Sequence, residues 1–361
     1  MEPKIMTATH QPKQADFSRN NSALPTGGDV GAGLTKLAVD SGDRQMKLRC
    51  PSKVVEVTEE LHDVLTAKDG GHFYYDSGDR ADLIGREFLT GALASWKAPS
   101  THIKLSDDPS LKADYALHCI LGAVASLPYR PQWNLHLALS IHNAKVFAPA
   151  LKEKVQGCHS IRNGGKGGVT SRVNLTVSLV APEGAGSYGY CLKSQLIDQT
   201  AHAIAFDFGT STVIPTVFAP GGAIIHRQVL EVGGCIDLLS AIASDTELIE
   251  FLGKGKSGSV ELIRQGIESG KFKYGSRAFK FEGIYNRHLE NWLNDQLRLA
   301  LKEVEEWRDA AQSFVAWGGG VQMPGIAEIL KTQDIIAVPD GCWANALGLQ
   351  RMAEGRLARG K

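Results

Sequence analysis

The chain has 361 residues, a length that predicts two lobes of about 150 residues each rather than one average domain. Its 43% hydrophobic and 22% charged residues are typical of a globular protein in water, and 39 Lys plus Arg against 39 Asp plus Glu argues against a nucleic-acid-binding surface. The six cysteines form no C-x-x-C pair, which argues against a zinc ribbon or a disulfide scaffold and favours the reducing cytoplasm.

The first 24 residues differ in composition from the rest of the chain. They are rich in Gln, Asn, Ser, Thr, Lys and Pro, and they contain no apolar run long enough for a signal peptide or a membrane span. Such a segment has too little apolar surface to offset the entropy of ordering it. We therefore predict a disordered tail over residues 1–24 and no attachment to a membrane.

The folded part is predicted to begin with a hairpin. Residues 34–39 and 46–50 have the composition of strands, and the turn residues 40–43 separate them. A P-loop or a Rossmann unit would instead lead from a strand into a helix. Neither the P-loop motif G-x-x-x-x-G-K-[ST] nor the Rossmann motif G-x-G-x-x-G occurs between a strand and a helix in this sequence. Further along, apolar spacing predicts helices at 81–96, 114–127 and 147–155 and strands at 134–141 and 172–180.

The second half repeats the strand–turn–strand order. A strand at 203–208 leads into a glycine turn, and strands at 213–218 and 224–229 follow. A glycine-rich stretch at 184–190 begins a short helix that would join the two halves. The remaining predictions are helices at 236–244 and 285–307, a loop at 254–258, strands at 313–317 and 335–338, an intervening helix, and a final helix from Trp343.

Two aspartate-led glycine turns carry the functional signal. The first turn, DVGAGLTK, runs from Asp29 to Lys36, and the second turn, DFGTST, runs from Asp207 to Thr212. Glycine lets backbone N–H groups approach an anion closely, and a carboxylate beside such a turn can hold a divalent metal through water. Two such turns, far apart in the chain, predict one nucleotide phosphate tail held between two halves of the molecule.

Five segments together resemble the actin-like ATPase superfamily, most closely the bacterial ParM/StbA group of filament-forming proteins. They are the first turn, residues 181–188 (APEGAGSY), the second turn, residues 317–326 (WGGGVQMPGI) and residues 340–348 (DGCWANALG). The resemblance implies an α/β actin-like ATPase fold, with ribonuclease-H-like duplicated domains and a nucleotide cleft between two lobes. It implies lobe I at 25–190, completed by a C-terminal helix at 340–361, and lobe II at 191–339, with a small insertion near 246–282.

The resemblance also implies roles for single residues. Asp29 and Asp207 would hold Mg²⁺ through water, Lys36 would place a positive charge near the phosphates, and Glu183 would orient the attacking water. Read without the family, Pro-Glu-Gly is also a helix-start signal. Gly318, Gly319 and Gly320 would approach the α-phosphate and sugar, and Met323 would pack beside the purine. Backbone amides of both turns would bind phosphate oxygens. These amides belong to Gly31, Ala32, Gly33, Leu34, Gly209, Thr210, Ser211 and Thr212.

The second turn departs from the family pattern. The family usually has glycine where Thr210 stands, and often an acid near the end of the turn, where this chain has Val213-Ile214-Pro215. A bulkier turn without a second carboxylate would slow hydrolysis or alter the set of groups around the metal. The nucleotide expected from the resemblance is ATP, with GTP as the other possibility, together with Mg²⁺.

Two functions from different classes follow from these observations. The first is a cytoplasmic filament-forming ATPase that polymerises head to tail, either for DNA or plasmid segregation or as a bacterial cytoskeleton. Its partners would be copies of itself and a ParR-like DNA-binding adaptor, without direct contact with nucleic acid. The alternative is a small-molecule kinase of the same superfamily, which needs a base beside an acceptor pocket, and we find no acidic motif dedicated to one.

Overall fold

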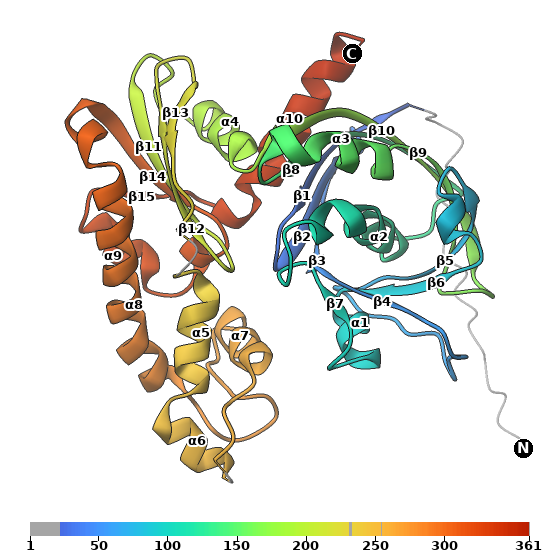
Figure 1. Ribbon diagram of the computed structural model, residues 1–361, viewed down its shortest axis with the longest axis horizontal. Coiled ribbons are helices and arrows are strands. Elements are labelled where there is room, and N and C mark those ends of the chain that lie inside the picture. The colour runs from blue at the N-terminus through green and yellow to red at the C-terminus, as the bar shows by residue number, and fades with distance from the viewer. Residues whose placement is uncertain (1–21, 231–232, 254, 361) are drawn as a thin grey trace, which may run out of the picture.

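The computed structural model describes residues 22–230, 233–253 and 255–360 (Figure 1). Two bodies lie side by side, each built on its own β-sheet. The predicted N-terminal tail lies outside the described residues except for its last three, of which Leu24 is the first residue of a strand. No helix in these ranges is both long and apolar enough to cross a bilayer.

The first sheet has ten strands in the order β3-β2-β1-β8-β10-β9-β5-β6-β4-β7. The predicted hairpin is confirmed, because β2 (Leu34–Asp40) pairs antiparallel with β3 (Gln45–Pro51). On its other side β2 pairs with β1 (Leu24–Val30). Strand β1 is parallel to β8, and β8 is parallel to β10. The other bounds are β8 (Gln132–Ile141), β10 (Val169–Pro182), β9 (Gly157–Asn163), β5 (His72–Gly78), β6 (Glu87–Thr90), β4 (Lys53–Glu56) and β7 (Ile103–Lys104).

Helix α2 (Leu111–Ala125) lies inside the curve of this sheet (Figure 1). Every residue from Ala116 to Val124 is buried, as expected for a helix that is apolar on all sides. Strand β10 instead alternates over its first part, where Val173, Leu175 and Val177 on one face are buried in the core. Helix α3 (Ala144–Val155) packs beside α2 and adds Leu151 and Val155 to the same core.

The second sheet has five strands in the order β13-β12-β11-β14-β15. Its core is formed with a group of helices, of which α8 is the longest and contributes Leu289, Leu293 and Leu297. The bounds are β11 (His202–Phe208), β12 (Val213–Phe218), β13 (Ile224–Arg227), β14 (Ala311–Trp317), β15 (Ile336–Ala337), α5 (Cys235–Ala243), α6 (Thr246–Leu252), α7 (Val260–Glu268), α8 (Glu282–Glu303) and α9 (Ile326–Lys331).

Two helices pass between the sheets. Helix α4 (Ala185–Lys193) packs Tyr188 and Cys191 against the second sheet, whereas α10 (Gly341–Ala358) packs Leu349 on the first. They cross at a pair of glycines, because a Cβ on Gly348 would lie 1.8 Å from the Gly186 carbonyl oxygen. This close crossing sets the distance between the two sheets.

One predicted helix is wrong. Residues 81–96 form a single 3₁₀ turn (Ala81–Leu83), strand β6 and the short helix α1 (Ala92–Lys97). Gly85 and Gly91 have φ values of +83° and +63°, which end a right-handed helix at both points. Between them Phe88 and Leu89 are buried in the sheet rather than on a helix face. The predicted helix at 285–307 corresponds to α8, which begins earlier at Glu282 and ends earlier at Glu303, and a 3₁₀ helix (Glu305–Ala310) continues the chain.

Candidate functional site

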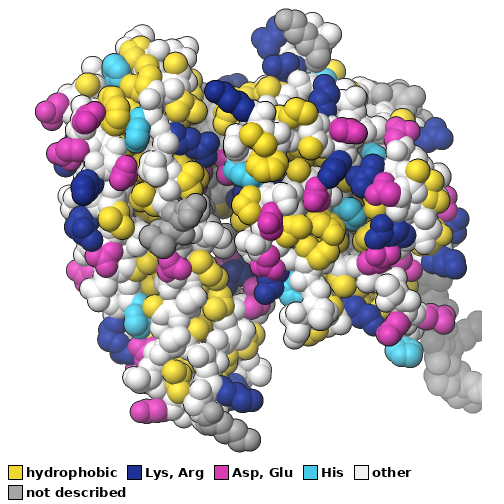
Figure 2. All heavy atoms as spheres, in the orientation of Figure 1, with side chains coloured by type: hydrophobic (Ala, Val, Ile, Leu, Met, Phe, Trp, Pro, Cys, Tyr) yellow, Lys and Arg dark blue, Asp and Glu magenta, His cyan; other side chains and the backbone are white. Residues whose placement is uncertain are grey.

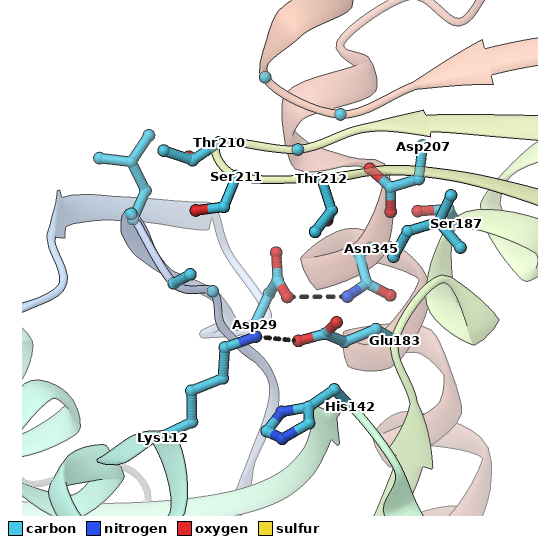
Figure 3. A pocket seen from close by; sticks show the side chains of 18 of the residues that line it. Asp29, Lys112, His142, Glu183, Ser187, Asp207, Thr210, Ser211, Thr212 and Asn345 are labelled. Carbon is cyan, nitrogen blue, oxygen red and sulfur yellow. Dashed lines mark hydrogen bonds and ion pairs between the residues drawn. The ribbon is translucent and has the colours of Figure 1, made fainter. Parts of the chain in front are cut away.

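A cavity of about 560 Å³, the cleft cavity, lies between the two sheets and is lined by residues from both (Figure 3). Both aspartate-led turns contribute to its lining. Among the predicted site residues, those that line it are Asp29, Gly31, Ala32, Gly33, Leu34, Lys36, Glu183, Asp207, Gly209, Thr210, Ser211, Thr212, Gly318 and Gly319.

Two of the predicted site residues lie elsewhere. Gly320 is buried, and a Cβ there would meet the Cys235 sulfur at 2.7 Å. Met323 is partly buried against the core of the second sheet. Neither belongs to the lining of the cleft cavity.

Sheet topology explains why these residues meet. The parallel pairs place Asp29 opposite Ser140, Pro182 opposite Ile141, and Asp207 opposite Trp317. His142 and Glu183 therefore follow adjacent strand ends, and Gly318 follows the end of β14. Ligands of α/β proteins characteristically bind outside the carboxyl ends of parallel strands, and here two sheets present those ends to one cavity.

The two turns have the same local structure. The Gly31 amide donates to the Leu34 carbonyl at 3.1 Å, and the Gly209 amide donates to the Thr212 carbonyl at 2.9 Å. The aspartate of each turn lies one pair before the last pair of its hairpin. The site is thus duplicated in backbone geometry as well as in residue type.

The two turns are also in contact. A Cβ placed on Gly33 would lie 2.4 Å from Thr210 Oγ1, so only glycine fits there without a shift. The turns are therefore close enough for one ligand to touch both.

Asp29 is held by several partners. Its Oδ1 accepts hydrogen bonds from Asn345 Nδ2 at 2.9 Å and from Ser140 Oγ at 3.2 Å. Its Oδ2 lies 3.3 Å from Lys36 Nζ. Asn345 also donates to Ser140, and its Oδ1 accepts from the Gly186 amide, so α10 and α4 both help to fix the Asp29 carboxylate.

The cavity is short of positive charge at Asp207. Burial is the largest cause that raises the pKa of this carboxyl, to about 7, and the negative charges of Asp29 and Glu183 add to it. A divalent cation between the two aspartates would supply the missing charge. Among the described residues, no three His, Cys, Asp or Glu side chains are close enough together to hold a metal ion. The donor set thus fits a metal held largely by water and phosphate oxygens.

Glu183 has a cationic partner. Lys112 Nζ, at the start of α2, lies 2.7 Å from Glu183 Oε1, and the two side chains are only 11% and 16% exposed (Figure 3). His142 lies beside them, and within the described residues neither of its ring nitrogens has a hydrogen-bond partner. Burial, and then the positive charge of Lys112, lowers the pKa of His142, which favours the neutral ring.

Several residues that line the cavity or hold Asp29 had no signal in the sequence. Lys112, His142 and Ser140 belong to no motif, and only the three-dimensional structure brings them together. Asn345 lies within the predicted segment at 340–348, but nothing marked it as a partner of Asp29.

No protein-family model matches the chain, and no curated protein matches it by sequence. Solved structures do match it. An archaeal actin homologue, Ta0583 in complex with ADP, has a TM-score of 0.70 at 19% identity and covers 91% of this chain and 99% of its own. The apo pSK41 ParM protein has a TM-score of 0.64 at 14% identity, covering 93% and 98%. The subunit of a 15-stranded ParM filament from Clostridium botulinum has a TM-score of 0.66 at 14% identity, covering 92% and 99%.

These likenesses extend over nearly the whole chain. At identities of 14% and 19% they establish the fold. The chain therefore has the α/β actin-like fold, and the fold class implied by its motifs is confirmed.

Proposed function

We propose that this protein binds and hydrolyses ATP in the cleft cavity and polymerises head to tail with copies of itself. One observation carries the proposal most directly: two turns of the same structure, each led by an aspartate, touch across the cavity. The lobes proposed are 25–190 with 340–361, and 191–339.

The Gly31 and Gly209 amides donate within their own turns. The remaining backbone amides of both turns would donate to phosphate oxygens, and charge-assisted bonds of this kind are strong. Lys36 would add a positive charge, and Gly318 and Gly319 would lie near the α-phosphate and sugar. Mg²⁺ between Asp29 and Asp207 would neutralise phosphate charge, which is the chemistry the metal supplies when bound. The resemblance favours ATP over GTP.

Hydrolysis would use Glu183. Its carboxylate would orient a water whose oxygen bonds to the terminal phosphorus, while the bond from that phosphorus to the bridging oxygen breaks. The products are ADP and phosphate, and the proton of the water is released. Assistance of this type contributes roughly two to four orders of magnitude in rate.

Assembly is supported by the fold and by the neighbours. One similar structure is a ParM filament, and another is an actin homologue with bound ADP. We propose a cytoplasmic filament that segregates DNA or plasmids through a ParR-like adaptor, or that serves as a cytoskeleton, without binding nucleic acid or membrane itself. On the face shown in Figure 2, basic and acidic side chains are interspersed, which agrees with the equal numbers of each in the chain.

Sedimentation and electron microscopy test this function. With Mg-ATP the purified protein should pellet and show filaments, and without nucleotide it should stay in the supernatant. Glu183→Gln should still form filaments but release phosphate more slowly, by about 100-fold or more. Soluble monomers at high protein concentration with Mg-ATP would contradict the filament proposal and favour the kinase.

A further inference from the structure

The ion pair between Lys112 and Glu183 is more enclosed than an ordinary surface pair. Both side chains line the cleft cavity, and at 11% and 16% exposure they have lost most of their water. An exposed pair contributes little, whereas a desolvated pair strongly restrains both groups, because separating them leaves a charge without a partner. The pair therefore fixes where the Glu183 carboxylate lies.

Lys36, another cation that lines the cleft cavity, already has a partner. Lys36 lies against Asp29, and the pKa of Asp207 is raised in part by the negative charge of Glu183. Lys112 is the cation that Glu183 contacts within the described residues. Without it, a bare carboxylate would face the negative oxygens of a terminal phosphate, and the two would repel each other.

One oxygen of the Glu183 carboxylate remains available. Lys112 occupies Oε1, and Oε2 accepts no hydrogen bond from the described residues. His142 flanks the pair with both ring nitrogens unpartnered, so it does not compete for Oε2.

Resting on the proposed function, we propose that Lys112 is a positioning residue for Glu183: it holds Oε1 so that Oε2 points at the attacking water, and it offsets the repulsion between Glu183 and the terminal phosphate. Lys112 acts through Glu183 and does not bind the phosphate itself.

A double-mutant cycle tests this inference in the full-length protein. Phosphate release and ATP affinity by calorimetry are measured for the unmodified protein, Lys112→Gln, Glu183→Gln and the double variant. Lys112→Gln should slow phosphate release about tenfold or more while changing ATP affinity less than about threefold. In the Glu183→Gln background it should slow release no further, and Lys112→Arg should restore most of the rate.

A second cycle needs no nucleotide. Urea unfolding of the same four proteins without ligand should show a coupling between the two positions, because each single variant leaves one partner unpaired. It also shows whether each variant folds. Lys154→Gln is the matched control, since Lys154 pairs with Asp114 on the same helix but outside the cleft cavity, and it should leave phosphate release unchanged.

The possible results distinguish a failure of the role proposed for Lys112 from a failure of the proposed function. If Lys112→Gln weakens ATP binding tenfold and still slows the Glu183→Gln protein, Lys112 binds phosphate directly and the inference is overturned. A wild-type rate in Lys112→Gln overturns the inference alone. If the unmodified protein neither binds ATP nor releases phosphate, the proposed function itself fails.

Discussion

The contact between Gly33 and Thr210 joins the two halves of the site. These residues lie in turns of different sheets, and the three atoms closest to a Cβ on Gly33 all belong to the Thr210 side chain. The fit between the turns therefore depends on the absence of one side chain at one position and on the size of another side chain facing it.

Gly33→Ala is expected to weaken ATP binding about tenfold, because the added methyl group pushes the turns apart and misplaces amides on both sides. Adding Thr210→Gly should restore binding, since it removes the three atoms nearest to the added methyl group. Calorimetric titration with Mg-ATP measures both effects. Gly167→Ala, where nothing lies within 4 Å, is the control. If Gly33→Ala bound ATP as tightly as the unmodified protein, the turns would not share a ligand.

His118 is a buried titratable group outside the cleft cavity. It lies on α2 with its ring 4.7 Å from Phe88 and 5.1 Å from Tyr115, and it is 4% exposed. Burial, followed by the positive charges of Arg80 and Arg86, lowers its pKa to about 3. The folded protein therefore keeps this ring neutral.

This pKa predicts a loss of stability in mild acid. An unfolded chain binds a proton at His118 below a pH of about 6.5, but the folded chain does not bind it until about pH 3. As the pH decreases between these values, the free energy of unfolding decreases too, by about 2 kcal/mol at pH 5. In urea unfolding, His118→Gln should remove this share of the decrease between pH 7 and pH 5, whereas His62→Gln, at an exposed histidine, should not. An unchanged pH dependence in His118→Gln would refute the assignment.

Motif residues were predictable from the sequence because their chemistry is carried by the backbone. A glycine turn after a strand can present backbone amides to an anion, so the residues of the two turns could be proposed from the sequence. Lys112 and His142 could not be named, because a lysine or histidine at the end of an element has a function only when another element faces it. Sheet order and strand register determine which residues face each other, and neither can be predicted from a short stretch of sequence.

The crossing of α4 and α10 depends on backbone contact between helices. Gly186 and Gly348 leave no room for a Cβ, and Gly27 of β1 approaches the Ala346 carbonyl in the same way. Since Asn345 on α10 holds Asp29, this crossing also positions the site.

Gly348→Ala is expected to lower the free energy of unfolding by about 1–3 kcal/mol, because its methyl group would overlap the backbone of α4. Gly355→Ala makes the same change on the same helix, where the nearest atom is 3.8 Å away. It should be neutral or stabilise by up to about 1 kcal/mol. Urea unfolding of both variants gives the comparison, and equal effects would mean that the helices do not cross this closely in solution.

Hairpins and long amphipathic helices were predictable, because their apolar periods are local. The region at 81–96 was not, since the sequence Glu87–Thr90 has an apolar run too short to distinguish a strand from a helix, and the sheet decides between them. Strands β5 and β9 were missed for the same reason. They pair with each other although α2, β8 and α3 lie between them in the chain, and on their other sides β5 pairs with β6 and β9 with β10.

The two bodies touch outside the cleft cavity as well. Arg49 of β3 lies 3.1 Å from Glu268 of α7, so an ion pair joins the first body to the second. Both side chains are more than a third exposed, and such a pair contributes little to stability. The contact between the bodies therefore rests mainly on α4, α10 and the two turns, and a ligand held by both turns would add to it.

A crystal structure grown with Mg²⁺ and a non-hydrolysable ATP analogue would show whether the two turns share one ligand. We expect density for a triphosphate in the cleft cavity, contacted by amides of both turns, with the metal between Asp29 and Asp207. An empty cavity under saturating ligand, or a nucleotide contacting only one of the two turns, would contradict it.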